Sequence, residues 1–466
     1  MATAPTAPPR ASDELDLAAP RPPVGGRLRD LLASGAVETV LLAAVDVQGR
    51  LKGKAYDPAV LLERVSSPEM CGYVFDTDLG MSADGGALAS WGNGFGDVAL
   101  LPDFATARLL PWLPRTALVS ASPMFGGWPL PVAPTTLLDE QLTLLAGHGL
   151  SLKAGIETEF VVYEGTARDA ATAVYQGLRP VTWDNRDYAL DQPARLADFT
   201  RRIRQALAGA GMPMEAVKLE SGPGQVEVTF PYGDVTAACL QHVLFKHATR
   251  AVAEECGLAS TFMAAPATGV GSGLHVHISL YRDDEPVLGS GRDDTTLSEL
   301  GEQAVAGLLK VLPQTTPMWA PYVNSYKRLA DHSFAPTRFT WGRDNRSCAV
   351  RVVGHGRGLH LEVRLPGADA NPYLTMAAVL AGIRHGIEAR LKPPQASTGD
   401  AYRNAAAPPV PAHLTSALDV FEGSALAAEL LGSEKVAHLA AIARLDLAHH
   451  SAVVTDAELV RGFAQA

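Results

Sequence analysis

The 466-residue sequence has few cysteines, few aromatic residues, no excess of positive charge and no long apolar run. Its four cysteines lie far apart, so neither a zinc knuckle nor a disulfide framework is predicted. The net charge of −11 argues against a nucleic-acid partner, because basic side chains hold the phosphates of such partners. The apolar runs are too short to span a bilayer, so no membrane partner is expected. With 47% hydrophobic and 19% charged residues, the chain is predicted to be globular.

The first 24 residues are rich in Pro and Ala, and they lack the basic region and apolar core of a secretion signal. We therefore predict a disordered tail over 1–24 and a cytoplasmic protein. The whole chain exceeds the length that one hydrophobic core usually supports, which predicts at least two domains. Because a proline-rich segment near 123–134 is a natural boundary, we expect a small domain over 25–128 and a large one over 129–466.

The distribution of turn signals and apolar patterns predicts an α+β protein with mostly antiparallel strands and long helices. A turn at Gln48-Gly49 separates two expected strands within 37–57. Helix caps are predicted where Ser, Thr, Asp or Asn precedes an apolar periodic segment. The sequence predicts further strands at 100–119, 153–164 and 258–266, a long loop over 71–98, and helices that begin after Thr135, Asp234 and Asn371.

The predicted strand "KAGIETEFVVYE" (153–164) carries two carboxylates on one face, because side chains alternate along a strand. Glu157 and Glu159 repel each other when both are ionised, and burial of either one alone is costly. One interpretation is an exposed edge with both groups in water. The other is a pair held together by a cation, which requires further ligands elsewhere in the chain.

Three later segments also place polar residues on one face of a predicted strand. Glu220 and Glu227 flank a Gly-Pro-Gly turn, His275 and His277 follow a Gly-rich approach, and Glu362 alternates with Arg364. Each segment taken alone has another interpretation. The Glu220–Glu227 segment could be an acidic hairpin in solvent, His275 and His277 could be buried core histidines, and Glu362 and Arg364 could form a simple ion pair with a neighbouring strand. A block rich in arginine over 324–352 suits the recognition of carboxylates and phosphates.

The chain resembles the glutamine synthetase superfamily in six motifs that follow one another in the family's order. They are Glu-x-Glu, Glu-x6-Glu around Gly-Pro-Gly-Gln, Gly-Ser-Gly-x-His-x-His, Asn-Ser-Tyr-Lys-Arg, Asn-Arg-Ser and Glu-x-Arg-x-Pro before Asn-Pro-Tyr. The resemblance runs from about Asp97 to the C-terminus. It implies a small β-grasp-like N-terminal domain and a large catalytic domain with an antiparallel sheet. It also implies a ring, usually a dodecamer, with active sites between neighbouring subunits.

The family joins L-glutamate to ammonia or an amine with ATP, through γ-glutamyl phosphate. The resemblance implies two Mg²⁺ or Mn²⁺ ions per active site, with Glu159, Glu220 and Glu227 on the glutamate side and Glu157, His275 and Glu362 on the ATP side. It implies ATP contacts from Glu215, Tyr232, His277, Ser279, Arg346 and Arg351, with Arg346 also stabilising the transferred phosphoryl group. It implies glutamate contacts from Gly271, Arg328 and Arg364.

Several positions depart from the family's pattern. Phe334 stands where ammonia-using members carry a flap glutamate, and Val270 replaces the usual asparagine of the glutamate site. The catalytic acidic residues supplied by the neighbouring subunit match Asp97 and, less closely, Asp76 or Asp78.

An aromatic ring in place of a carboxylate removes a base and a charge and supplies an apolar wall. We therefore expect an amine ligase that uses ethanolamine or a polyamine. The alternatives are an ammonia-using glutamine synthetase and a non-catalytic relative.

Overall fold

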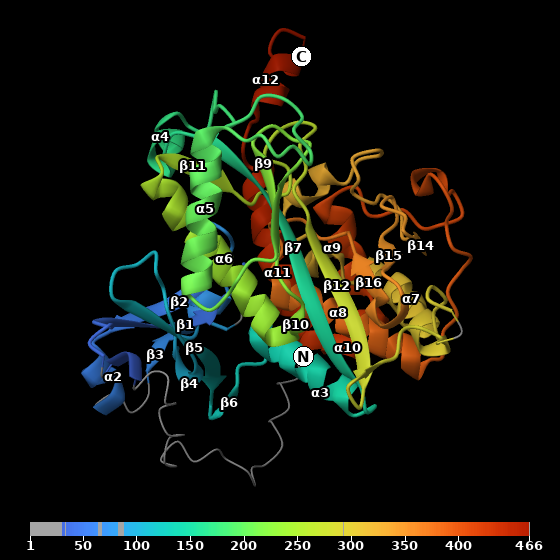
Figure 1. The fold of residues 1–466 in the computed structure, drawn as a ribbon, viewed down its shortest axis with the longest axis horizontal. Helices are drawn as coiled ribbons and strands as arrows, with labels where there is room; N and C mark the ends of the chain where they lie inside the picture. The colour runs from blue at the N-terminus through green and yellow to red at the C-terminus, as the bar shows by residue number, and fades with distance from the viewer. Residues whose placement is uncertain (1–29, 33, 64–67, 83–87, 292, 466) are drawn as a thin grey trace.

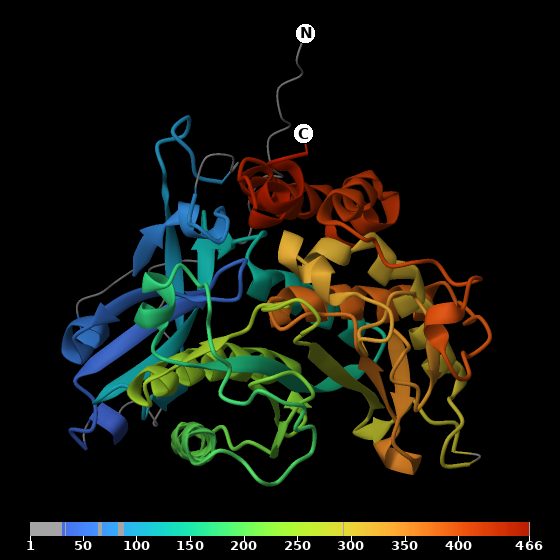
Figure 2. The ribbon, with the colours of Figure 1, turned by 90° about the horizontal axis from the view of Figure 1, so that it is seen from above.

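The computed structural model describes residues 30–465 except residues 33, 64–67, 83–87 and 292. The tail predicted over 1–24 lies outside the described residues. The described chain forms two β-sheets, and Figure 1 shows β7 (Ser151–Glu164) and β12 (Leu274–Arg282) of the larger sheet in front of helices such as α8 (Pro372–Glu388) and α10 (Ala425–Leu431). Figure 2 shows the smaller sheet on one flank and the C-terminal helices grouped as a separate layer.

The smaller sheet has the strand order β2-β1-β5-β4-β3, and β6 pairs with β5. β1 and β2 form the hairpin that the Gln48-Gly49 turn predicts, with Val45 opposite Leu51. β1 pairs with β5 in parallel, whereas the other pairs are antiparallel. The elements are β1 Thr39–Val45, β2 Leu51–Tyr56, α2 Pro58–Glu63, β3 Glu69–Cys71, η1 Gly72–Phe75, β4 Asp97–Leu109, β5 Thr116–Phe125 and β6 Trp128–Pro129.

Two predictions in this region need correction. The single strand expected at 100–119 is two antiparallel strands, because the segment between Leu109 and Thr116 reverses the chain. The loop expected at 71–98 is shorter, since η1 follows β3 directly and β4 begins at Asp97. The β-grasp character of this sheet and the domain boundary after residue 128 stay predictions.

The larger sheet is antiparallel apart from its β14–β15 edge, as the sequence predicted. Its order is β14-β15-β16-β12-β7-β9-β8, while β10 and β11 pair with β7 and β13 pairs with β12. The strands are β7 Ser151–Glu164, β8 Ala216–Leu219, β9 Gln225–Thr229, β10 Gly233–Asp234, β11 Leu258–Thr261, β12 Leu274–Arg282, β13 Glu285–Pro286, β14 Trp341–Arg343, β15 Val350–Val353 and β16 His360–Val363.

The helix starts confirm two of the three predicted caps. Asp234 accepts a hydrogen bond from the Ala237 amide at 2.8 Å, and Asn371 accepts one from the Tyr373 amide at 2.9 Å. Thr135 was wrongly predicted as a cap, because the helix already begins at Pro134, whose fixed φ and missing N–H suit the first helical position. The helices are α3 Pro134–Ala146, α4 Ala167–Thr172, α5 Ala194–Gly209, α6 Val235–Glu255, α7 Glu299–Val311, η2 Leu312–Gln314, η3 Thr316–Met318, η4 Val323–Arg328, η5 Gly356–Gly358, α8 Pro372–Glu388, η6 Ala401–Arg403, α9 Leu414–Gly423, α10 Ala425–Leu431, α11 Ser433–Ser451 and α12 Asp456–Gly462.

The alternation of side chains along β7 separates the core from the site. Ile156 and Phe160, at even positions, are buried in the two large hydrophobic clusters that include residues of α6 and α8. Glu157 and Glu159, at odd positions, point to the opposite face of the sheet. The packing of the strand on its helices therefore fixes where the carboxylates lie.

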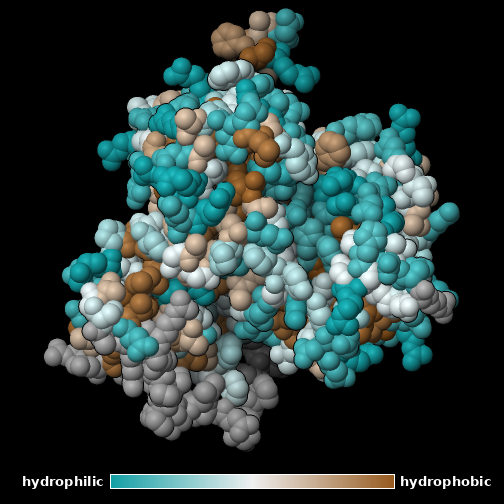
Figure 3. All heavy atoms as spheres, in the orientation of Figure 1, coloured by the Kyte–Doolittle hydropathy of each residue, from teal (hydrophilic) through white to brown (hydrophobic). Residues whose placement is uncertain are grey.

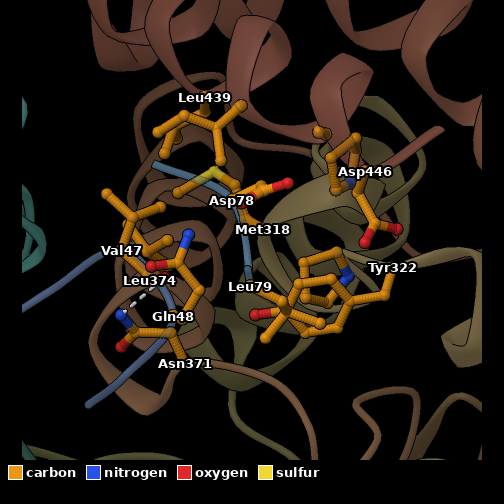
Figure 4. Close-up of a pocket in the computed structure, with 14 residues that line it drawn as sticks. Val47, Gln48, Asp78, Leu79, Met318, Tyr322, Asn371, Leu374, Leu439 and Asp446 are labelled. Carbon is orange, nitrogen blue, oxygen red and sulfur yellow. Dashed lines mark hydrogen bonds between the residues drawn. The ribbon is translucent and has the colours of Figure 1, made fainter. Parts of the chain in front are cut away.

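The β1–β2 turn docks onto the N-terminus of α8. The Asn371 side-chain amide donates hydrogen bonds to the carbonyls of Asp46 and Val47, each at 3.0 Å. Figure 4 shows the small cavity at this junction, where Gln48 and Leu79 from the N-terminal part face Tyr322 and Leu439. Residues far apart in the sequence thus form one continuous packing unit.

Hydrophilic and hydrophobic side chains are interspersed over the face seen in Figure 3. Within the described residues, no helix combines the length and the hydropathy that crossing a bilayer requires.

Glycines allow α7 and α8 to cross in close contact. A Cβ built on Gly307 would lie 2.0 Å from the Gly382 carbonyl oxygen and 2.7 Å from Gly386 Cα. Because both contacts are backbone atoms, the helices would have to separate to admit a methyl group. Gly307→Ala should therefore lower the free energy of unfolding by about 1–3 kcal/mol or more, measured by urea denaturation.

Gly423, at the end of α9, provides the matched control, since a Cβ there meets nothing within 4 Å. Gly423→Ala should leave stability unchanged or raise it slightly. Equal stability of the two variants would contradict the close crossing of α7 and α8.

Candidate functional site

An acidic row crosses the larger sheet from β9 to β16. Within it, Glu159 on β7 lies directly opposite Glu227 on β9, and Glu157 lies opposite His275 on β12. His277 on β12 in turn lies opposite Glu362 on β16. Directly opposed strand residues bring their side chains close together, so four strands contribute to one site.

The glutamate residues predicted on the glutamate side lie together. Ligand oxygens of Glu159, Glu220 and Glu227 are all within 4.8 Å of one another. The Gly-Pro-Gly turn returns the chain from Glu220 to Glu227, and Gly224 has φ +70° and lies against the Val162 carbonyl, where a Cβ would be 2.5 Å away. Only glycine fits that turn without strain.

Burial and neighbouring negative charge oppose the ionisation of Glu220 and Glu227. Desolvation, together with the charges of Glu157, Glu220 and Glu159, raises the pKa of Glu227 to about 9. Burial and the charge of Glu159 also raise the pKa of Glu220. Three carboxylates in such a place need a cation, because unpaired buried charge is strongly disfavoured.

Lys218 is a site residue that sequence reasoning missed. Its ammonium group contacts the Glu220 carboxylate and lies 4.0 Å from Glu227 Oε1, 3.3 Å from Asp187 Oδ1 and 4.4 Å from the Tyr188 ring centroid. The available signal was its position two residues before Glu220 on β8, which places both on one strand face. Within the described chain, Lys218 is the cation paired with the trio.

Gln225 was also missed as a site residue, although it lies inside a quoted motif. Its side-chain amide donates to Glu159 Oε2 at 3.0 Å and to the Gly271 carbonyl at 2.8 Å. The Gly273 amide donates to the same Glu159 oxygen at 2.7 Å. Glu159 is therefore fixed in orientation by two donors.

The second group surrounds Glu157. His275 Nδ1 lies 3.5 Å from Glu157 Oε2, and His277 Nε2 lies 3.1 Å from Glu157 Oε1. Burial alone would raise the pKa of Glu157, but both imidazoles outweigh it and hold that pKa well below its usual range. The ligand atoms of His277 form a close group with those of Glu157 and Glu362, whereas those of His275 group with Glu157 and Glu227. His275 Nδ1 also lies 3.9 Å from Glu362 Oε1, as the predicted ligand set requires.

Glu362 is almost completely buried and pairs with two arginines. Arg351 Nη1 donates to Glu362 Oε2 at 2.8 Å, and Arg364 contacts the other oxygen. Burial would raise the pKa of Glu362, but Arg364 first and then the neighbouring histidines and Arg351 lower it to about 2. The carboxylate is therefore ionised at neutral pH.

These side chains fit hard divalent cations. Carboxylate oxygens dominate both groups, with imidazole as the remaining donor, which suits Mg²⁺ or Mn²⁺ better than zinc. His275 Nδ1 is the ring nitrogen that faces the carboxylates, 3.5 Å from Glu157 Oε2 and 3.9 Å from Glu362 Oε1.

Two open cavities, each of about 480 Å³, meet at this acidic row. The first contains the six predicted metal ligands together with Gly271, Phe334 and Arg364. The second contains all six predicted ATP contacts and His360. The residues common to both cavities are Glu157, His277, Arg346 and Arg351. A group passed from one cavity to the other would pass these four residues.

Arg346 stands at the junction of the two cavities. It is exposed, and its guanidinium has no carboxylate partner among the described residues. An arginine in this state can receive a phosphate, because its planar donors match phosphate oxygens.

One predicted glutamate contact, Arg328, does not line either cavity. Arg328 is buried behind the wall, where its guanidinium donates to the carbonyls of Leu365 at 3.0 Å and Arg364 at 3.3 Å. Its predicted contact with glutamate would require part of this guanidinium to turn outward.

Asp76, Asp78 and Asp97 lie outside both cavities of the same chain. Asp76 is buried, and its carboxylate accepts hydrogen bonds from the Leu88 and Ala89 amides. Because these aspartates were expected to act at a neighbouring subunit's site, their role stays a prediction.

Comparison with known proteins relates this geometry to a family. Residues 131–461 match the catalytic domain of glutamine synthetase. The chain is 41% identical over 461 residues to a γ-glutamylethanolamide synthetase of Streptomyces coelicolor, covering 98% of this chain and 99% of that protein. It is 31% identical to a glutamate–isopropylamine ligase of Pseudomonas, covering 93% and 97%. The solved structure of GmaS in complex with ADP superposes with a TM-score of 0.82 at 27% identity, covering 94% of this chain and 99% of that one.

The raised pKa of Glu227 generates a pH-dependent prediction. Its carboxyl keeps a proton in the folded, metal-free protein between its ordinary pKa of 4.5 and about 9, whereas the unfolded chain has released it. The folded state therefore binds more protons, so stability falls as pH rises through this window. Glu227→Gln, which cannot ionise, should show a smaller loss in urea denaturation from pH 5 to pH 9 with EDTA.

Glu429 on α10 is exposed and provides the matched control, so Glu429→Gln should follow the wild-type pH profile. Added Mg²⁺ or Mn²⁺ should raise the melting temperature of the wild type more than that of Glu227→Gln, because a ligand that binds only the folded state stabilises it. Parallel pH profiles and equal metal responses would refute the assignment of Glu227 to a cation site.

Proposed function

The chain belongs to the glutamine synthetase family, and we propose that this member joins L-glutamate to a carbon-bearing amine with ATP. The reaction proceeds through γ-glutamyl phosphate, because a carboxylate is too poor an electrophile to react with an amine directly. The ethanolamine and isopropylamine ligases among the relatives support this class of acceptor. Ethanolamine or a polyamine is the acceptor that we favour.

We assign the acidic row to two divalent cations. Glu159, Glu220 and Glu227 would hold one ion. Glu157, His275 and Glu362 would hold the other, since His275 Nδ1 lies 3.5 Å from Glu157 and 3.9 Å from Glu362, and His277 is a competing ligand. Mg²⁺ or Mn²⁺ bound there supplies positive charge beside the phosphate oxygens. Lys218 has to leave Glu220 when the first ion binds, and Asp187 and Tyr188 offer its ammonium group a second position.

The two cavities suit two substrates that meet end to end. The cavity lined by Glu215, Tyr232 and Ser279 is assigned to ATP, and the one lined by Gly271 and Arg364 to glutamate. Arg346 and Arg351 would stabilise the phosphoryl group during transfer, since charge spreads over its oxygens in the transition state. An oxygen of the γ-carboxylate attacks the terminal phosphorus of ATP, and ADP leaves.

The proposed preference for a carbon-bearing amine rests on the position of Phe334 in the first cavity. Its ring is 64% exposed and lines the first cavity, while its backbone has a left-handed φ of 60°. The Phe334 carbonyl lies 3.5 Å from Arg364 Nη2, which connects the flap to the glutamate site. An apolar ring at this mouth favours the methylenes of an amine, whereas ammonium would need carboxylates to bind it and take its proton.

Assembly and location are further proposals. A homododecamer with active sites between subunits would bring Asp97, and Asp76 or Asp78, to the acceptor side of a neighbour's cavity. Asp97 is exposed and therefore available to a neighbouring subunit, whereas Asp76 and Asp78 are buried within their own chain. We place the enzyme in the cytoplasm, where ATP and glutamate are available as substrates.

The acceptor assignment predicts a preference for carbon-bearing amines. In an assay of phosphate release with ATP, Mg²⁺ and glutamate, kcat/KM should be higher for ethanolamine or putrescine than for ammonia at neutral pH. Phe334→Glu should lower kcat/KM for the preferred amine by about tenfold or more, because a charge replaces an apolar wall.

Phe334→Leu is the matched control, since it keeps an apolar wall and should retain the amine preference. Ammonia preferred by the wild type would make the protein an ordinary glutamine synthetase. Failure to release phosphate with any acceptor would favour a non-catalytic relative.

A further inference from the structure

A third cavity, of about 530 Å³, lies apart from the two catalytic ones and shares no lining residue with them. It opens between the β1–β2 turn, α6 and η4, beside the small cavity of Figure 4. Gln48, Leu79 and Tyr322 line both of these neighbouring cavities. The other residues that line the third cavity include several cationic side chains.

Cationic side chains dominate the lining of the third cavity. Arg50, Lys246, Arg250 and Lys327 line it, whereas Asp369 is the one carboxylate among its lining residues. Arg50 is already neutralised by Asp46, with Nε and Oδ2 2.7 Å apart. The other three cations lack a carboxylate partner within 4 Å in the described part of the chain, which leaves surplus positive charge facing the cavity.

Lys246 and Arg250 lie one helical turn apart on α6 and border the same aromatic ring. Lys246 Nζ is 5.1 Å and Arg250 Cζ is 5.7 Å from the Phe262 ring centroid. Lys246 is 8% exposed, and its ammonium group donates one hydrogen bond, to the Ala368 carbonyl at 3.0 Å. An ammonium has three donors, so the remaining two can reach a ligand.

The electrostatics agree with this geometry. Burial, and then the charge of Arg250, lowers the pKa of Lys246 to about 7, and burial with the charge of Arg50 lowers the pKa of Arg250. Asp369 has a pKa raised to about 6 by burial, so it is mostly ionised at neutral pH, and its Oδ2 accepts a hydrogen bond from Ser325 Oγ at 2.7 Å. One carboxylate beside Lys246, Arg250 and Lys327 still leaves the cavity with surplus positive charge. Like charges held together without a counter-ion are costly, and an anion would relieve that cost.

We propose that this third cavity binds a small organic dianion through Lys246, Arg250 and Lys327. The apolar part of the ligand packs on Phe262 and Met263, and its doubly charged group, a phosphate monoester or a pair of carboxylates, lies among the cations. The volume suits a compact metabolite, since ligand cavities usually run from about 300 to 1,000 Å³. Lys327 immediately precedes Arg328 on η4, so the ligand lies against the element that carries a predicted glutamate contact.

Pyridoxal 5′-phosphate provides a site-specific probe for the assembled, full-length protein. Its phosphate supplies the dianion, and its aldehyde condenses with the unprotonated amine of Lys246, losing water to form an imine. Cyanoborohydride then reduces the imine to a stable secondary amine, which peptide mass spectrometry locates. Glycerol 2-phosphate and succinate serve as competing dianions of the two chemical classes, and acetate serves as the monoanion control.

We expect Lys246 to be the main labelled lysine, protected by one of the dianions and not by acetate. Arg250→Gln should weaken that protection by about tenfold, because it removes a charge-assisted hydrogen bond. Arg204→Gln, which changes an exposed arginine on α5, should leave it unchanged. The dianion that protects at the lower concentration identifies the class of ligand.

Calorimetric titration with the same dianions tests binding without reliance on lysine chemistry. Arg250→Gln, or Lys327→Gln if the former does not fold, should lose binding that Arg204→Gln retains. Labelling spread over exposed lysines without protection, together with equal titrations of all variants, would overturn the proposal.

Discussion

The architecture depends on one constraint, the burial of several carboxylates on a single sheet face. Glu220 and Glu227 cannot both ionise beside that face without a cation, because burial and the neighbouring carboxylates raise the pKa of each. The chain answers locally with Lys218 beside the trio and with arginines on Glu362. Divalent ions complete the compensation in our account. The helices behind β7 and the glycine turn before β9 are the means by which the fold holds these charges together.

Charge also divides the molecule into functional regions. The two cavities over the sheet share Glu157, His277, Arg346 and Arg351, so negative ligands for metal and positive donors for phosphate meet at one point. The charged side chains that line the cavity beside α6 are mostly cationic, and this cavity lies at the junction with the smaller sheet. Phe334 provides the apolar contrast at the mouth of the first cavity. In our proposals, acceptor choice, phosphate transfer and anion binding use different parts of these cavity walls.

Local sequence rules predicted much of this site because its signals are local. Alternation placed Glu157 and Glu159 on one face, and the caps at Asp234 and Asn371 follow from side chains that bond nearby amides. The motifs in their family order predicted which distant segments meet. The parallel pairing of β1 with β5, by contrast, depends on tertiary packing that no local pattern records.

Other features escaped prediction for identifiable reasons. Thr135 has the right residue type for a cap, but Pro134 begins the helix one position earlier. Lys218 was missed although its spacing from Glu220 signalled the pair. Arg328 instead donates to the Leu365 carbonyl, an acceptor supplied by a segment distant in the sequence. Such a contact depends on three-dimensional competition for partners rather than on spacing.

The central claim is that the cavities join glutamate to an amine through an acyl phosphate. Glutamate labelled with ¹⁸O in its γ-carboxylate tests this claim directly, in a reaction with ATP and the preferred amine. The account predicts that inorganic phosphate acquires one labelled oxygen for each amide formed, because the attacking carboxylate oxygen leaves bonded to phosphorus. Phosphate released without label while the amide forms would contradict it.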